Sequence, residues 1–256
     1  MIGLYQFQQF VQFSECLHGV SMKDTTVPFS FSLALHTGEY EALIVENRKL
    51  ITETFETDVS LHFVVANQTH SDHIHVVTKE ETRGWESLES AIADCDALIT
   101  DRKGVMLGVL TADCVPVLLY DPVRQVVAAV HAGWRGTQKL IVAKTVKRME
   151  EDFGCNSANI YAGIAPAIGK CCYEVGEDVA KHFFYVKEGY EQKGERYMLD
   201  LPFINRAQLL DAGVKDMHIE MSGICTACEV DRFFSYRKEE GCTGRFMSLI
   251  GIAPSP

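Results

Sequence analysis

Three continuous apolar runs near the middle of the chain constrain its fold more than any other feature. They are VMLGVL (105–110), VPVLLY (115–120) and VVAAV (126–130), and the turn Asp121-Pro122 separates the last two. Each run has the length of a β-strand, and a strand that is apolar on both sides is covered on both faces of its sheet. None approaches the roughly 20 residues that a membrane-spanning helix needs. The runs therefore predict an α/β or α+β fold with a mixed sheet.

The rest of the chain supplies further elements at helical or strand periodicity. Helices are expected over 39–52, from about Thr137 to Phe153, and over 201–210; strands are expected over 62–68, 73–77 and 159–165; and a hairpin-like pair of strands is expected over 233–252, around Gly241 and Gly244. The sequence contains neither a repeat nor a Pro/Ser-rich linker. A single domain over residues 1–256 is therefore expected.

Composition and charge exclude some classes of partner. The formal net charge is −11, and no run of basic residues stands out, so a nucleic acid polymer or an anionic membrane surface is not expected as a partner. The N-terminal MIGLYQFQQFVQF lacks the basic and apolar regions of a signal peptide, so we expect a cytoplasmic protein with reduced thiols. We therefore interpret its nine cysteines as core thiols, metal ligands or reactive groups in preference to disulfides.

Three residues at the ends of predicted strands form a candidate metal site. His131 ends the third apolar run, Cys114 lies between the first two, and His70 follows the strand 62–68. Taken singly, each is better explained as a structural residue: a histidine bonded to a carbonyl, or a thiol in the core. Taken together, one Cys and two His leave a fourth coordination position open, which is typical of catalytic zinc. A Cys114 nucleophile with His131 as its base fits the same residue types.

The turn Gly133-Trp134-Arg135-Gly136-Thr137 predicts an anion site beside His131. Its glycines allow close backbone approach, the following helix begins with free N–H groups, and Arg135 offers a fork suited to phosphate. A plain strand-to-helix turn with Arg135 in solvent explains the pattern equally well.

Other polar residues give weaker signals. His73 and His75 would share one strand face, but their spacing fits no zinc signature. A structural zinc on Cys225-Thr-Ala-Cys228 would need a second pair, and only the vicinal Cys171-Cys172 is available, so we disfavour that site. Asp96, Asp113 and Glu174 are candidate acids, bases or partners of the ligands.

Several blocks together resemble the laccase-domain family, first named a multicopper polyphenol oxidoreductase. They are QTHS (68–71), DALIT (96–100), LTADCVPVLLYDP (110–122), AAVHAGWRGT (128–137), GIAPAIGKCCYEVG (163–176), LDLPFINRAQL (199–209), CTAC (225–228) and FFSYRKEEGCTGRFMSLI (233–250). The resemblance spans nearly the whole chain and is that of a bacterial member. One departure is His73, where the family often has a basic residue.

The resemblance implies zinc on His70, Cys114 and His131, and helices outside two central sheets, in a layered α/β/β/α arrangement. Family members are regarded as zinc-containing purine nucleoside phosphorylases with adenosine deaminase activity. The implied substrates are adenosine, inosine and methylthioadenosine, with phosphate. We predict catalytic roles for Cys114, His131 and Arg135; predicted substrate or phosphate ligands are Asn47, Arg48, Ser71, Gly133, Gly136, Cys172 and Arg245.

Two other functions stay open at this stage. A polyphenol oxidoreductase would use copper, and Cu²⁺ is a possible ion here, but nine histidines with one His-x-His pair are too few for several copper centres. A hydrolase or transferase would use Cys114 as its nucleophile. A homodimer is a further possibility.

Overall fold

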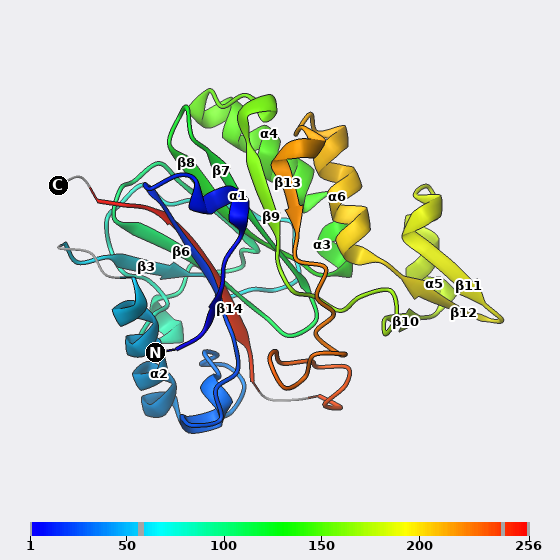
Figure 1. The fold of residues 1–256 in the computed structure, drawn as a ribbon, viewed down its shortest axis with the longest axis horizontal. Coiled ribbons are helices and arrows are strands. Elements are labelled where there is room, and N and C mark those ends of the chain that lie inside the picture. Colours follow the sequence, from blue (N-terminus) through cyan, green and yellow to red (C-terminus); the bar gives the residue numbers. More distant parts are fainter. Residues whose placement is uncertain (1, 56–58, 242–243, 255–256) are drawn as a thin grey trace.

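Two β-sheets lie face to face at the centre of the computed structural model, which describes residues 2–55, 59–241 and 244–254 (Figure 1). The five-stranded sheet has the order β1 (Leu4–Tyr5), β2 (Cys16–Ser21), β14 (Phe246–Ile252), β6 (Val105–Thr111), β3 (His62–Val65). The six-stranded sheet has the order β13 (Ile219–Met221), β9 (Tyr161–Ile164), β7 (Val115–Asp121), β8 (Val126–Ala132), β5 (Ala97–Thr100), β4 (Ile74–Val76). Both sheets mix parallel and antiparallel pairs.

The apolar runs are central strands whose alternate side chains enter different cores. On β6, Leu107 and Val109 face the second sheet, where they pack with Leu118 of β7. Met106 and Leu110 of the same strand point the other way, toward the helix α2 (Glu41–Thr54). Every residue of β6, β7 and β8 is buried, which confirms the predicted coverage on both faces.

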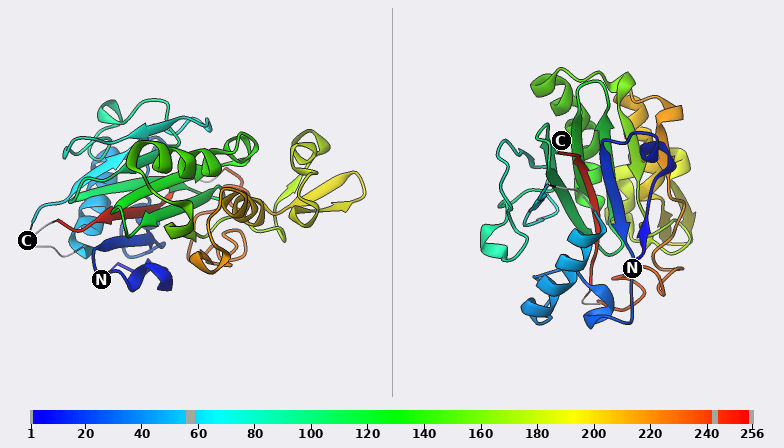
Figure 2. Two further views of the ribbon diagram at one scale, coloured as in Figure 1. Left: turned by 90° about the horizontal axis from the view of Figure 1, so that it is seen from above. Right: turned by 60° about the vertical axis from the view of Figure 1, so that its left-hand side comes forward.

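Helices cover the outer faces of the two sheets. α2 lies on the five-stranded sheet, and α4 (Ile141–Phe153) and α6 (Leu201–Asp211) lie on the six-stranded sheet (Figures 1 and 2). On α4, Val142, Val146 and Met149 form the buried stripe. The predicted layered α/β/β/α arrangement is thus confirmed. The single-domain prediction for residues 1–256 stays a prediction.

A small three-stranded sheet extends from one end of this sandwich, at the right of Figure 1. Its order is β10 (Glu174–Val175), β12 (Arg196–Leu199), β11 (Tyr190–Lys193), and α5 (Glu177–Ala180) lies beside it. The remaining short helices are α1 (Gln8–Val11), α3 (Trp134–Gln138) and the 3₁₀ turns η1 (Pro28–Phe31), η2 (Leu88–Ser90), η3 (Ser157–Asn159), η4 (Lys181–Phe183), η5 (Lys187–Gly189) and η6 (Asp216–His218).

Two sequence predictions differ from the structure. The helix expected from about Thr137 begins instead at Ile141 as α4, and a separate short helix, α3, precedes it, because Leu140 adopts a left-handed conformation (φ 63°) between them. The C-terminal hairpin is wrong: Phe233–Gly241 forms turns, and only β14 is a strand. β14 pairs instead with β2 and β6. Backbone groups of 233–241 bond to the side chains of Asp113 and Glu239, which takes the place of strand pairing. Residues 242–243 lie outside the described residues.

Over the described ranges, the helices are all too short or too polar to cross a membrane.

Candidate metal centre and active-site cavity

Three strand ends bring His70, Cys114 and His131 to one point. His70 follows β3, Cys114 lies in the short connection from β6 to β7, and His131 belongs to β8. One ligand atom from each lies within 4.8 Å of the others, and Cys114 Sγ is 3.8 Å from His70 Nε2. The two imidazole rings meet edge to face, with centroids 4.8 Å apart. The set could therefore hold a metal ion with one Cys and two His ligands.

Asp96, which precedes β5, holds two of these residues in place. Its Oδ1 accepts hydrogen bonds from Nδ1 of His131 (2.7 Å) and from the backbone N–H of His70 (3.1 Å). Its Oδ2 accepts from both the N–H and the hydroxyl of Ser71, each at 2.7 Å. Because His131 donates from Nδ1, its Nε2 is left as the nitrogen that can bind a metal. Asp96 is thus one of the acidic partners that the sequence analysis considered.

Charges within this group shift the pKa values of its members. Burial acts to raise the pKa of Cys114, but the adjacent His131 and hydrogen bonds from both histidines lower it to about 6. Burial acts to lower the pKa of His131, but Cys114 and Asp96 raise it to about 9. The charged forms of Cys114 and His131 therefore stabilise each other against the cost of burial. A thiolate is the form that binds metal or attacks an electrophile.

The backbone around Cys114 is held in an unusual conformation. Asp113 has φ of 89°, in the left-handed region that non-glycine residues seldom adopt. Its side chain accepts hydrogen bonds from the hydroxyl of Thr226 (2.7 Å) and from the N–H of Arg237 (2.6 Å), and its carbonyl accepts from the N–H of Ile168 (2.9 Å). These bonds stabilise the strained turn that presents Cys114. Both carboxylate oxygens of Asp113 therefore serve to hold this turn.

The ligand group lies in the wall of a cavity of about 490 Å³. The cavity is lined by His36, Gln68, His70, Leu110, Thr111, Ala112, Asp113, Cys114, His131, Trp134, Ile168, Tyr173, Leu201, Tyr236, Arg237 and Arg245. Its volume is within the range of small-molecule sites. Two arginines supply positive charge, and each guanidinium lies over a tyrosine ring: Arg237 over Tyr173 at 5.3 Å and Arg245 over Tyr236 at 5.8 Å.

Sequence reasoning missed most of this cavity. Of its lining, it had named Arg245 as a substrate ligand but not Arg237, Tyr173 or Tyr236. The signal was present in FFSYRKEEG, where a tyrosine and an arginine are adjacent and charged residues follow them. We interpreted that segment as a strand, and a strand prediction gives no reason to place its arginine in a site.

Other predicted binding residues lie elsewhere. Arg48 is fully buried and its guanidinium donates to the carbonyls of Leu33, Gly84 and Trp85. Asn47 is also buried and donates to two carbonyls. Such contacts are those of structural residues, and a phosphate role for them stays a prediction.

The turn after His131 packs closely against the three candidate metal ligands and the residues beside them. A Cβ on Gly133 would lie 2.9 Å from His70 Cδ2 and 3.2 Å from Cys114 Sγ, so this glycine lets the ligands approach the backbone. Gly136 similarly packs against the carbonyl oxygen of Ser71. Arg135 is exposed and lies over the Trp134 ring at 4.4 Å.

The remaining histidine candidates lie outside the candidate metal group, whereas four of the cysteines form a second cluster. His73 pairs with Asp94, and His75 is exposed, so neither joins the ligand group. The sequence argument disfavoured a zinc site on the two cysteine pairs, but the structure brings the two pairs together. Loops 56 residues apart in the chain bring all four sulfurs within 4.8 Å of one another, and these include Cys172, which was predicted to bind substrate.

The chain belongs to the family described as multi-copper polyphenol oxidoreductase laccase, whose sequence model matches residues 11–253. This family membership agrees with the resemblance seen in the sequence. The class of protein is thereby shown together with its fold.

Relatives with assigned names refine this picture. The chain is 37% identical to purine nucleoside phosphorylase YlmD of Bacillus subtilis, over 91% of this chain and 85% of that protein. It is 32% identical to adenosine deaminase RL5 of an unknown prokaryotic organism, over 81% of each. A crystal structure of Bacillus licheniformis hypothetical protein YfiH superposes with a TM-score of 0.91 at 36% identity, covering 98% of this chain and 97% of that one. YlmD from Geobacillus stearothermophilus superposes at 0.88 with 33% identity, covering 96% and 94%.

Proposed function

We propose that this protein is a zinc-dependent purine nucleoside phosphorylase that acts on adenosine, inosine and methylthioadenosine and also deaminates adenosine. The observation that carries the proposal is the convergence of His70, Cys114 and His131 on a cavity with two arginines. The names of the relatives supply the reaction class.

The donor set fits zinc. Zn²⁺ binds thiolate and imidazole ligands, and a three-residue set leaves one position for water or substrate. When bound, the ion would supply Lewis acidity toward an oxygen of the substrate or of water. Asp96 would keep His131 in the tautomer that coordinates through Nε2 and would fix its ring orientation. Gly133 would leave room for the ligand side chains.

Phosphorolysis would give roles to the other residues that line the cavity. An oxygen of hydrogenphosphate forms a bond to C1′ of the ribose as the C1′–N9 bond breaks, and the departing purine takes up the proton that the hydrogenphosphate loses. Arg237 and Arg245 would bind the phosphate, because guanidinium forks match its oxygens. Tyr173 and Tyr236 offer ring faces on which a purine can stack. The same cavity would admit water for deamination at C6 of adenosine.

The test uses purified protein with measured zinc content. With inosine and phosphate it should release hypoxanthine and ribose 1-phosphate, and omission of phosphate should abolish that product. With adenosine, adenine reports phosphorolysis while inosine and ammonia report deamination. A zinc-replete sample that leaves all three nucleosides unchanged would overturn the proposal.

One observation favours a second candidate, a thiol enzyme. Cys114, His131 and Asp96 are arranged as nucleophile, base and orienting carboxylate, and the pKa of Cys114 is lowered to about 6. Zinc content distinguishes the two, because a metal-bound thiolate is blunted as a nucleophile. Alkylation of Cys114 at the same rate before and after zinc loading would favour the thiol enzyme.

A copper oxidase is the third candidate, suggested by the family's description. A Cu²⁺ ion could occupy the His70–Cys114–His131 set, since imidazole and thiolate also suit copper. Phenol oxidation by a protein purified with copper but without zinc would favour it.

A further inference from the structure

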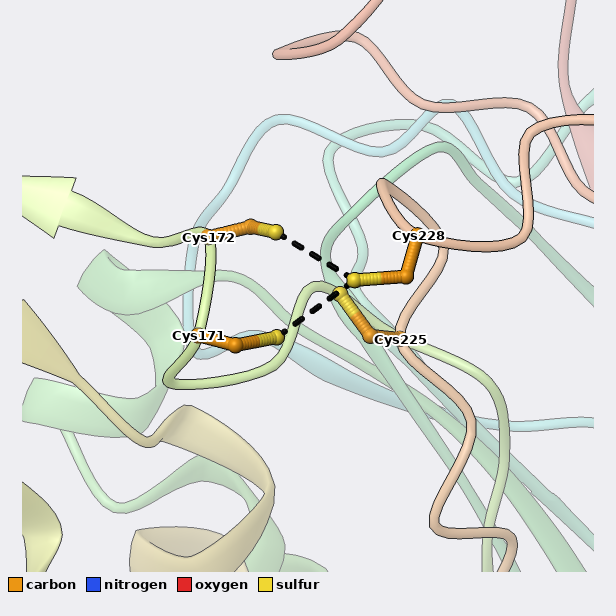
Figure 3. Close-up of side chains that lie close together, drawn as sticks. All are labelled: Cys171, Cys172, Cys225 and Cys228. Atoms are coloured by element: carbon orange, nitrogen blue, oxygen red, sulfur yellow. Dashed lines mark hydrogen bonds between the residues drawn. The ribbon is translucent and has the colours of Figure 1, made fainter.

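We propose that Cys171, Cys172, Cys225 and Cys228 bind a second, structural Zn²⁺ ion, separate from the His70–Cys114–His131 set. Cys171 and Cys172 lie in the loop between β9 and β10, and the other pair lies in the loop after β13. Figure 3 shows the two pairs pointing into the space between these loops.

The spacing of the four sulfurs suits a tetrahedral ion. Cys228 Sγ is 3.6 Å from Cys171 Sγ and 3.5 Å from Cys172 Sγ, and all four sulfurs lie within 4.8 Å of one another. Zn–S bonds of about 2.3 Å place tetrahedral sulfurs ~3.8 Å apart, so small rotations of the side chains would complete the sphere. Four thiolates close the coordination shell, which is the pattern of a structural site. Binding releases the thiol protons to solvent, with no change in oxidation state.

The surrounding backbone also fits a sulfur-ligated ion. The N–H of Gly169 donates to Cys225 Sγ at 3.2 Å, as a backbone donor beside a metal-bound thiolate does. A Cβ on Gly169 would lie 3.2 Å from Cys225 Cβ and 3.5 Å from Cys171 Sγ. Gly169 therefore lets the two loops approach each other closely, as Gly133 does at the other set.

The cluster lies where a bound ion would hold two loops beside the active-site cavity. Thr226, within the CxxC turn, is fully buried and bonds to Asp113, the strained residue before Cys114. Tyr173, directly after Cys172, lines the active-site cavity. An ion that joins the two loops would hold both residues, and through them the turn of Cys114 and one wall of the cavity.

The first test is the number of zinc ions per chain, with four samples purified under reducing conditions. We expect about two for the unaltered protein, about one for C225S/C228S, about one for H70A/C114S, and about two for the control C155A. Cys155 is a buried thiol outside both clusters. The proposal fails if the unaltered protein and C225S/C228S bind the same amount.

Cobalt gives a second, spectroscopic readout of a sample in which all four cysteines of the cluster are intact. In H70A/C114S loaded with Co²⁺, four thiolates should produce an intense near-ultraviolet charge-transfer band and the visible bands of a tetrahedral ion. C228H should retain the ion with a weaker charge-transfer band, because imidazole replaces one thiolate, whereas C228A should bind it less tightly. Absence of these bands, or a mass showing disulfides among the four cysteines in reduced preparations, would overturn the proposal.

Discussion

Replacement of Asp96 by Asn tests how far a single carboxylate organises the metal centre. Asp96 is 1% exposed, and its two oxygens accept from His131, His70 and Ser71. An Asn has one acceptor oxygen, so its NH₂ group must face either the N–H of Ser71 or that of His131. One donor is then left unpaired in a buried site, at a cost of about 1–3 kcal/mol. Loss of a carboxylate behind a metal-binding histidine also typically lowers metal affinity 10–100-fold, which is about 1.4–2.7 kcal/mol.

The assay is competition for zinc against a chromophoric chelator, together with urea unfolding of the metal-free protein. Asp94→Asn is the matched control, because Asp94 is exposed and bonds to Thr69 and His73 but to none of the ligands. We expect D96N to bind zinc at least about tenfold more weakly than the control. Equal zinc affinity in D96N and D94N would refute the role assigned to this carboxylate.

Three further perturbations follow from the same structure. Gly133→Ala would place a methyl group 2.9 Å from the His70 ring. Because that ring is exposed and can move, we expect weaker zinc binding with little loss of stability. Unchanged zinc affinity would contradict the packing argument. Arg237→Met should raise the KM for phosphate by roughly 10–100-fold through loss of a charge-assisted contact, with the KM for inosine much less affected. Burial lowers the pKa of His18 below 6.5, so the unfolded chain takes up the proton first. Stability from the neutral ring is complete above pH 6.5 and declines as the pH falls below it. Urea unfolding from pH 8 to 5 should show this decline, and His18→Gln should make it smaller, with a remainder from His36, His75 and His218, whose pKa values burial also lowers.

The predicted ligand set shows what strand patterning can achieve. His70, Cys114 and His131 each follow or end an apolar strand, and strand ends are where a rigid scaffold presents polar side chains. That reasoning selected the residues, but it left structural explanations open for each one. Their meeting depends on the packing of two sheets, since His70 follows a strand of the five-stranded sheet, His131 lies on the six-stranded sheet, and Cys114 lies in the connection between the two.

The two cysteine pairs and Arg237 show where patterning was insufficient. Cys172 of the vicinal pair and Cys228 of the CxxC pair are 56 residues apart, and no local rule indicates that a parallel bridge between Ala167 and Cys225 joins their loops. The segment with Arg237 has strand-like residues, but tertiary bonds to Asp113 keep it as a loop at the cavity. In both cases, contacts distant in sequence overrode local preference.

The sequence by itself determined the buried strands and the covering helices, because side-chain periodicity and strand length are local properties that burial requires directly. It also predicted His70, Cys114 and His131 as one group, and the structure brings these three residues together. Only the tertiary structure decided which residues share a cavity, that Arg48 is buried against backbone carbonyls, and that four cysteines gather. Those outcomes depend on how two sheets and their loops pack, and the packing energy is distributed over contacts between residues far apart in the chain.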